Sequence, residues 1–230
     1  MSNKFPIYFF KMPSQYWLTS TFLRFQEHYE SPKFRNLGFS LEEFQDWYVT
    51  TRDHGEFSYY ADWAGFNFPS FVVDNFTPEN FGKFSRKENW LLDTLKDAEG
   101  KFYVIGTASS SDDDSVINHE LAHAFFYINE EYAAAARQIL QGADFSAFTN
   151  ILFEMGYCSE VLDDEIVAYM MTGLTSEMSK VKPPNFKEIK RLLLENFQQK
   201  IGFNLSDEIE TKKIINEKIN LIDGNSIVTQ

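Results

Sequence analysis

Cysteine and positive charge are both scarce in this chain. Its 230 residues include one cysteine, Cys158, so no intrachain disulfide can form, as is typical of a reducing compartment, and we expect Cys158 to fill a core position. Only 21 lysines and arginines stand against 34 acidic residues, which gives a net charge of −13. This charge argues against binding to nucleic acid or to an anionic membrane surface, and it favours a basic substrate or partner.

Long apolar runs and a secretory signal are also missing. The apolar stretch after Lys4 covers only residues 5–10, contains Pro6, and is followed by Lys11 without a small-residue cleavage site. No other segment is long enough to cross a bilayer. We therefore expect a cytoplasmic protein, with export by a route that needs no signal as the alternative.

Histidine is the third scarce residue, and two of the four histidines lie close together. The segment from His119 to His123 reads His-Glu-Leu-Ala-His, the HExxH pattern, within an apolar stretch typical of a buried helix. Residues 112–115, three aspartates and a serine, offer N-cap positions for this helix. Histidines four residues apart lie on one helical face and can reach one cation, and Glu120 turns toward the same side. This arrangement suits a zinc-activated water with a carboxylate base beside it.

Other interpretations of the two histidines can be compared with the rest of the chain. As ordinary core residues they would need hydrogen-bonding partners, and burying three polar groups on one apolar helix is costly without a shared partner. A di-iron site needs a second ExxH element, but Phe25 and Thr51 occupy the positions three residues before the other two histidines, His28 and His54. A metzincin-type third histidine is missing as well, because Asn129 occupies its position and the sequence has no histidine after His123. Any downstream ligand must therefore be a carboxylate.

The third ligand is sought in the predicted helix at residues 160–172. Glu165 is followed by three apolar residues and is the better candidate for pointing inward, whereas Asp163 and Asp164 can stay solvated at the helix start. Glu160 is the rival, because Glu160 and Asp164 form a Glu-x-x-x-Asp pair in which the second acid would orient a histidine. If Glu165 is the ligand, Tyr169 follows one turn later and can donate to a ligand or an oxyanion. An acidic helix start without any metal is the third interpretation.

Together these residues resemble the zincin group of metallohydrolases, with a glutamate third ligand in the gluzincin manner. The resemblance covers roughly residues 101–172 and implies one zinc ion held by His119, His123 and Glu165, with Glu120 as the general base. Gluzincins place an aspartate four residues after the ligand glutamate, where this chain has Tyr169. Nothing in the first hundred residues extends the resemblance.

The predicted function is zinc-dependent hydrolysis of a peptide bond in a peptide or protein substrate. Glu120 would take the proton of the attacking water, and an oxyanion donor would come from Tyr169, Tyr157 or His54. Two alternatives remain at this stage. A non-catalytic, zinc-stabilised interaction module would close the fourth metal position and would not need Glu120, and a hydrolase of a small non-peptide amide would have a closed pocket.

The predicted fold is α+β and forms a single zincin-like domain over residues 1–230. An α+β lobe with a small N-terminal sheet covers residues 1–110, and a helical lobe with the metal site covers residues 111–230. In the first lobe we expect strands at 7–11, 68–73 and 101–107 and helices at 14–29, 40–52 and 85–98, the last two starting with capping boxes. The strand at 101–107 is either an edge strand that pairs with substrate or an inner strand.

The second lobe is expected to be helical throughout after His123. Its predicted helices are 129–140, 144–155, 160–172, 186–201 and 206–219, with a linker at 176–184 and a frayed end at 224–230. Aromatic residues make up 17% of the chain and concentrate in its first hundred residues. They indicate either a core packed with large rings or an aromatic substrate groove.

Overall fold

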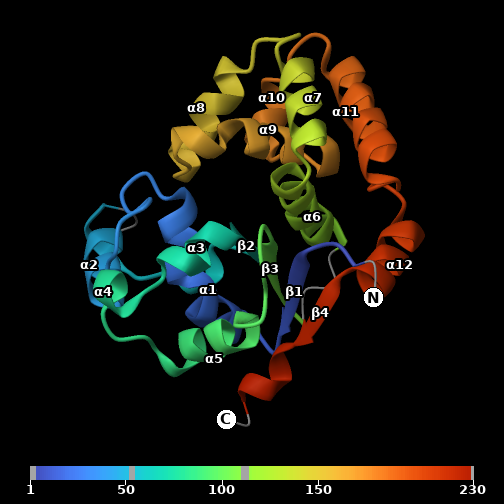
Figure 1. Ribbon diagram of the computed structural model, residues 1–230. Coiled ribbons are helices and arrows are strands. Elements are labelled where there is room, and N and C mark those ends of the chain that lie inside the picture. The colour runs from blue at the N-terminus through green and yellow to red at the C-terminus, as the bar shows by residue number, and fades with distance from the viewer. Residues whose placement is uncertain (1–3, 52–54, 110–113, 229–230) are drawn as a thin grey trace. The chain divides into compact units, whose positions relative to one another are not determined.

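The computed structural model describes residues 4–51, 55–109 and 114–228 (Figure 1). They form an α+β fold, as predicted, divided into two compact units. The sheet unit comprises residues 7–109, apart from 52–54, and residues 221–228; the helical unit comprises residues 4–6 and 114–220. The N-terminal residues 4–6 thus belong to the helical unit, and the C-terminal residues 221–228 belong to the sheet unit. A single boundary near residue 110 does not describe these two segments. No described helix is long and apolar enough to cross a membrane.

The sheet unit is built on four strands in the order β2-β3-β1-β4. β1 (Ile7–Met12) runs parallel to β3 (Tyr103–Ala108), and β2 (Gly65–Pro69) runs antiparallel to β3 on its other side. β4 (Asn220–Asp223) covers the free edge of β1. Its helical elements are α1 (Gln15–Glu30), α2 (Leu41–Thr51), η2 (Tyr59–Ala61), α3 (Ser70–Asn75), α4 (Pro78–Phe81), α5 (Arg86–Leu95) and η4 (Gly224–Ile227).

The inner position of β3 decides between the two interpretations of this strand. All six of its residues are buried, and both of its edges are paired. Pairing of an extended substrate with this strand is therefore excluded, and the edge-strand interpretation is wrong.

Gly106 lets α1 lie close to the sheet, because a Cβ atom there would stand 2.7 Å from Cζ of Phe22 and 2.9 Å from Cδ1 of Leu18.

Both predicted capping boxes are present. Ser40 and Glu43 exchange hydrogen bonds at the start of α2, and Ser85 and Glu88 do so at the start of α5. Glu88 of the second box also accepts hydrogen bonds from the buried guanidinium of Arg24. Helix starts could be read from local sequence because each capping interaction spans only three residues.

Three expectations about local structure are wrong. The predicted strand at 68–73 ends at Pro69, and α3 begins at Ser70, because burial of Val72 in the core overrides its strand propensity. The predicted linker contains α10 (Ser176–Lys180), which Thr175 caps and Met178 anchors with a fully buried side chain. The expected frayed end at 224–230 begins instead with η4, which follows β4, a strand that was not predicted and that covers the edge of β1.

The aromatic residues of the sheet unit pack against one another in its core. Phe25 stacks between Phe68 and Phe76, with ring centroids 5.0 and 3.9 Å apart, and Phe76 continues the stack to Phe81 at 4.1 Å. All four side chains are almost completely buried. Here the concentration of rings serves the core, the first of the two interpretations drawn from composition.

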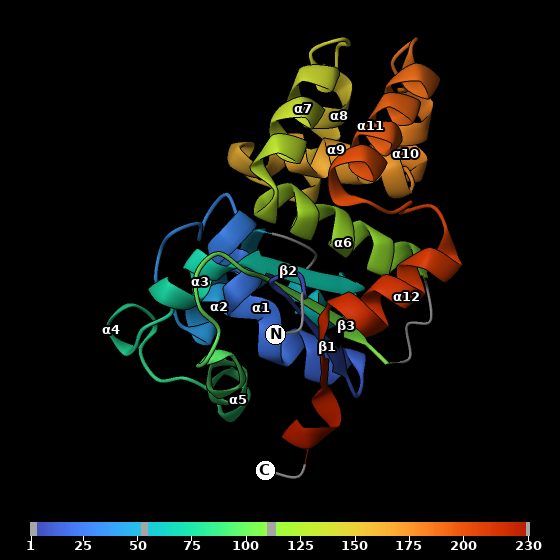
Figure 2. The same ribbon diagram turned by 45° about the vertical axis from the view of Figure 1, so that its right-hand side comes forward.

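The helical unit contains seven α-helices and a short 3-10 turn within its described residues. They are α6 (Asp114–Ile128), α7 (Glu130–Leu140), α8 (Ser146–Met155), η3 (Ser159–Val161), α9 (Leu162–Thr172), α10, α11 (Phe186–Ile201) and α12 (Glu208–Lys218). α9 packs against α6, α7, α8 and α11, and Figure 2 shows α7 and α11 side by side. The core of the helical unit includes three rings in contact, those of Phe125, Phe197 and Phe203. Cys158 is buried, as expected.

One buried arginine joins four segments of the sheet unit. Arg24 on α1 is 4% exposed, and its five N–H groups have five acceptors. Nε and Nη2 each lie 2.7 Å from an oxygen of Glu88, and the other bonds go to the backbone carbonyls of Phe39, Phe81 and Lys83. A buried charge with every donor satisfied is stable where it is, but its removal leaves Glu88 unpaired.

We expect Arg24→Met to destabilise the sheet unit by about 3–5 kcal/mol, because it leaves the buried Glu88 carboxylate without a cation and three carbonyls without their arginine donor. All four tryptophans of the chain, at positions 17, 47, 63 and 90, belong to this unit, so urea unfolding followed by tryptophan fluorescence reports on it selectively. Lys96→Met, at an exposed position at the end of α5, is the matched control and should unfold like the wild type. Equal midpoints for Arg24→Met and the control would contradict the assigned role.

Candidate metal centre

Two packed helices of the helical unit bring three predicted ligands together. His119 and His123 lie one turn apart on α6, and their ring centroids are 4.7 Å apart. Glu165 on α9 faces both: its Oε2 is 3.8 Å from His119 Nε2, and its Oε1 is 3.6 Å from His123 Nε2. One ligand atom from each of the three residues lies within 4.8 Å of the other two. These are the two histidines and the carboxylate proposed from the sequence.

The far side of each imidazole ring contacts an oxygen. Thr172 donates its hydroxyl proton to the carbonyl of Ala168, so its oxygen is left to accept from His119 Nδ1, 3.2 Å away. His123 Nδ1 lies 3.0 Å from Oδ1 of Asp164. Both contacts favour a proton on Nδ1, and in a neutral ring this leaves the Nε2 lone pair directed toward Glu165. This is the orientation a metal-binding histidine requires.

Carboxylates dominate the electrostatics of this cluster. Burial alone would lower the pKa of His123, but Asp164 and Glu165, with a further contribution from Glu120, hold that pKa well above its usual value. Burial raises the pKa of Asp164 against the opposing pull of His123. Glu120, Asp164 and Glu165 are 5%, 7% and 2% exposed. Three buried carboxylates beside two imidazoles carry an excess of negative charge that a divalent cation would balance.

The donor set fits a zinc ion. Ligand atoms bound at 2.0–2.1 Å to a tetrahedral zinc lie about 3.3 Å apart. The nitrogen–oxygen separations of 3.6 and 3.8 Å, each to a different oxygen of Glu165, are somewhat longer than this. Oε2 of Glu165 is buried and accepts no hydrogen bond from any described group, although a buried carboxylate oxygen normally does. Two imidazoles and one carboxylate are also the ligand set of open, catalytic zinc sites.

The other acids of this segment lie elsewhere. Glu160 is exposed on η3, where its carboxylate accepts from the Ser159 hydroxyl at 2.8 Å. Asp163 is exposed and faces Arg137 at 3.6 Å. Asp164 is buried at the cluster, so the expectation that it stays solvated is wrong. With Glu165 facing the histidines, Asp164 contacts His123 itself, a role that the sequence had suggested only beside Glu160.

The local pattern contained a signal for Asp164. Neighbouring helix residues differ in direction by about 100°, so two adjacent acids can both face a packed helix when they flank its line of contact. The three apolar residues after Glu165 indicated which way that residue points but not which side of the contact line Asp164 occupies. Only the packing of α9 on α6 settles this.

Among the proposed oxyanion donors, Tyr169 contacts the cluster. Its ring meets the His119 ring edge to face at a centroid distance of 4.6 Å, and it is partly exposed. His119 keeps 18% of its side chain exposed, so solvent reaches the cluster at this ring. Tyr157 is buried just before η3, and His54 lies outside the described residues.

Comparison with known proteins adds no relative. No protein-family model matches the chain, and searches of curated proteins and of solved structures found no match. Interpretation of the cluster therefore depends on its own geometry and chemistry.

We expect the purified wild-type protein to bind about one zinc ion per chain, as three protein ligands at a single site require. Glu165→Ala should lose the zinc, because it removes the ligand that joins α9 to the two histidines. Glu160→Ala removes an equally acidic side chain a few residues away and should keep it. Zinc content after dialysis, measured by elemental analysis, distinguishes them; zinc lost in Glu160→Ala but kept in Glu165→Ala would overturn the assignment.

We further expect Asp164→Asn to lower zinc affinity about 10- to 100-fold, the usual cost of losing a carboxylate behind a metal-binding histidine. The measurement is competition with a chromogenic chelator. Asp163→Asn changes the same charge at the preceding, exposed position and should leave affinity unchanged. Equal affinities for the two variants would show that Asp164 does not act through His123.

Proposed function

We propose that this protein is a zinc-dependent hydrolase that cleaves peptide bonds. The observation that carries the proposal is the convergence of His119 and His123 from an HExxH helix with the buried carboxylate of Glu165. Partial exposure of His119 supports a site that a substrate can reach. A purely structural zinc site would have four protein ligands, whereas the cluster found among the described residues offers three.

In this proposal, each residue of the cluster has a separate task. His119, His123 and Glu165 hold the metal, with Thr172 and Asp164 orienting the two imidazoles. Bound zinc would supply a Lewis acid that lowers the pKa of a water molecule toward neutrality and polarises the substrate carbonyl.

Glu120 is assigned the role of general base. It follows the first histidine on α6, is 5% exposed, and acts on His123 electrostatically, which supports a position beside the ligands. Glu120 would accept the proton of the attacking water and deliver it to the leaving amine.

Tyr169 is assigned the role of oxyanion donor. It lies one turn after Glu165 on α9, the position where gluzincins carry an aspartate, and its ring packs against His119. The aspartate's orienting task is left to Asp164 in this chain. We assign the Tyr169 phenol to donate to the negative charge that develops on the substrate carbonyl.

The net charge of −13 supports a basic peptide or protein as substrate, and it does not favour nucleic acid or an anionic membrane surface as partners. A single buried cysteine is compatible with the reducing cytoplasm as the place of action.

We expect Glu120→Gln to reduce peptide hydrolysis by about 10²- to 10⁴-fold while zinc content stays near one per chain. The amide keeps the shape of the side chain but accepts no proton. Hydrolysis is measured on casein and on a fluorogenic peptide library that contains basic and acidic members, with elemental analysis on the same preparations.

Glu154→Gln, an exposed position on α8, is the control and should keep full activity. Unchanged hydrolysis in Glu120→Gln would contradict the assignment of the base. A wild-type protein that binds zinc but cleaves no library member would favour the non-catalytic, zinc-stabilised module instead.

A further inference from the structure

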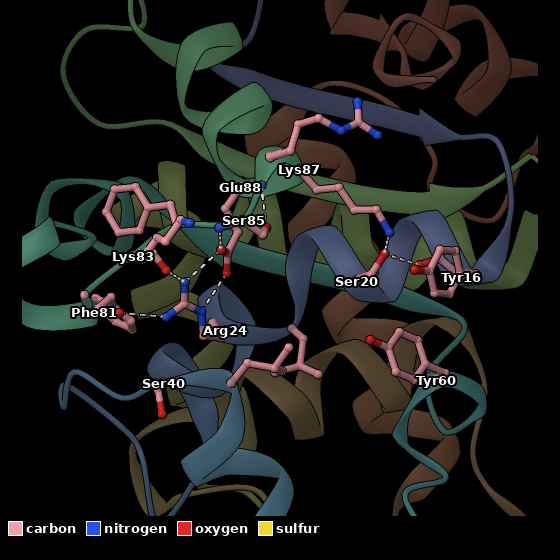
Figure 3. Close-up of a pocket in the computed structure, with 15 residues that line it drawn as sticks. Tyr16, Ser20, Arg24, Ser40, Tyr60, Phe81, Lys83, Ser85, Lys87 and Glu88 are labelled. Carbon is pink, nitrogen blue, oxygen red and sulfur yellow. Dashed lines mark hydrogen bonds and ion pairs between the residues drawn. The ribbon is translucent and has the colours of Figure 1, made fainter. Parts of the chain in front are cut away.

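A second candidate site lies in the sheet unit, within a pocket of about 610 Å³ (Figure 3). Its walls come from α1, from the start of α2, from Tyr60 of η2 and from residues 81–88, which lead into α5. A pocket of this size suits a small molecule. The metal cluster belongs to the helical unit, so this pocket carries an inference that does not depend on the proposed hydrolysis.

The pocket is held in shape by the buried Arg24. Its hydrogen bonds reach Phe39, just before the start of α2, then Phe81 and Lys83, and finally Glu88 on α5. Figure 3 shows the bonds to Phe81, Lys83 and Glu88 converging on the guanidinium. Because the same segments line the pocket, its walls are fixed before any ligand enters.

Charge in the pocket is opposite to that of the whole chain. Four cationic side chains line it, but the only carboxylate is that of Glu88, which Arg24 and the backbone N–H of Ser85 bind. No carboxylate of the described residues pairs with the remaining three, Lys83, Arg86 and Lys87. Arg86 donates to the carbonyl of Ile227 and lies over the Trp17 ring, so Lys83 and Lys87 are the two cations of the pocket that an anion would meet.

Lys87 is the cation best placed to contact a ligand. Its ammonium donates to the Ser20 hydroxyl and lies 3.8 Å from the centre of the Tyr16 ring and 4.5 Å from that of Trp17. Ser20 takes one of its three N–H groups and the Tyr16 hydroxyl accepts from another, so one remains for an anion. Lys87 also lies in the first turn of α5, where the helix dipole favours negative charge.

Two tyrosines provide a flat surface beside this charge. The rings of Tyr16 and Tyr60 stack at 5.6 Å with an angle of 23° between them, and Tyr16 is 58% exposed. Both line the pocket. Lys87 lies over the Tyr16 ring, so an aromatic ring of a ligand would extend the stack from the partly exposed Tyr60.

We propose that this pocket binds a small organic phosphate that carries an aromatic ring, of which a mononucleotide is the simplest example. Lys87, assisted by Lys83 and the start of α5, contacts the phosphate, and Tyr60 of the tyrosine pair stacks on the ring. A phosphate suits the site better than a carboxylate because its two charges and three terminal oxygens can meet several donors at once.

Isothermal titration calorimetry with adenosine 5′-monophosphate tests the proposal, with adenosine and inorganic phosphate titrated separately. We expect the monophosphate to bind the wild type with micromolar to low millimolar affinity that weakens as salt is added. Each component alone should bind at least tenfold more weakly. No heat of binding at millimolar monophosphate, or equal affinity for the monophosphate and either component, would overturn the proposal.

Variants separate the two contacts without disturbing Arg24. Lys87→Ala and Tyr60→Ala should each weaken monophosphate binding at least tenfold, and Lys96→Ala, at an exposed position at the far end of α5, should not. The tryptophan-monitored unfolding midpoint of each variant verifies that the sheet unit is intact. Wild-type affinity in folded Lys87→Ala would exclude the site. Glu165→Ala, which removes the proposed zinc ligand, should bind the monophosphate normally.

Discussion

Burial of ionisable side chains between α6 and α9 is the constraint on which the proposed chemistry depends. Glu120, Asp164 and Glu165 are nearly inaccessible to water, and together with the two histidines they form a cluster that is negative on balance. Such a cluster is stable only if protons or a cation offset the repulsion among the carboxylates. Protons can offset this repulsion in the metal-free protein, whereas a divalent cation among the three facing ligand atoms would take the place of any proton on the ligating Nε2 atoms.

In the sheet unit, too, the charge of a buried carboxylate is offset, but by an arginine of the protein itself. There the buried carboxylate of Glu88 is neutralised by Arg24, and every N–H of the guanidinium is satisfied within the protein. No further cation is required, and the outcome is a rigid frame in place of a reactive site. The frame surrounds a pocket whose other cations have no acidic partner among the described residues. One unit therefore offers a site with excess negative charge and the other a site with excess positive charge.

Short-range features of the fold were predictable. Both capping boxes mark helix starts, and the strands at β1 and β3 and most helices of the second half lie within a few residues of their predicted positions. The predictions that were wrong concern contacts between residues far apart in the sequence. β4 forms only because β1 offers a free edge, and α3 replaces a predicted strand because Val72 is needed in the core. Neither edge pairing nor core packing is visible in a window of a few residues.

At the candidate site, sequence alone determined the chemistry available. It supplied HExxH on a helix, removed a third histidine and a second ExxH element from consideration, and directed attention to the acids after residue 160. Tertiary structure decided which of those acids take part. Packing of α9 on α6 turns Glu165 toward the two imidazoles and Asp164 toward His123, and it leaves Glu160 exposed. The physical reason is that a helix's sequence defines its faces, whereas the partner helix determines which residues along the line of contact are buried.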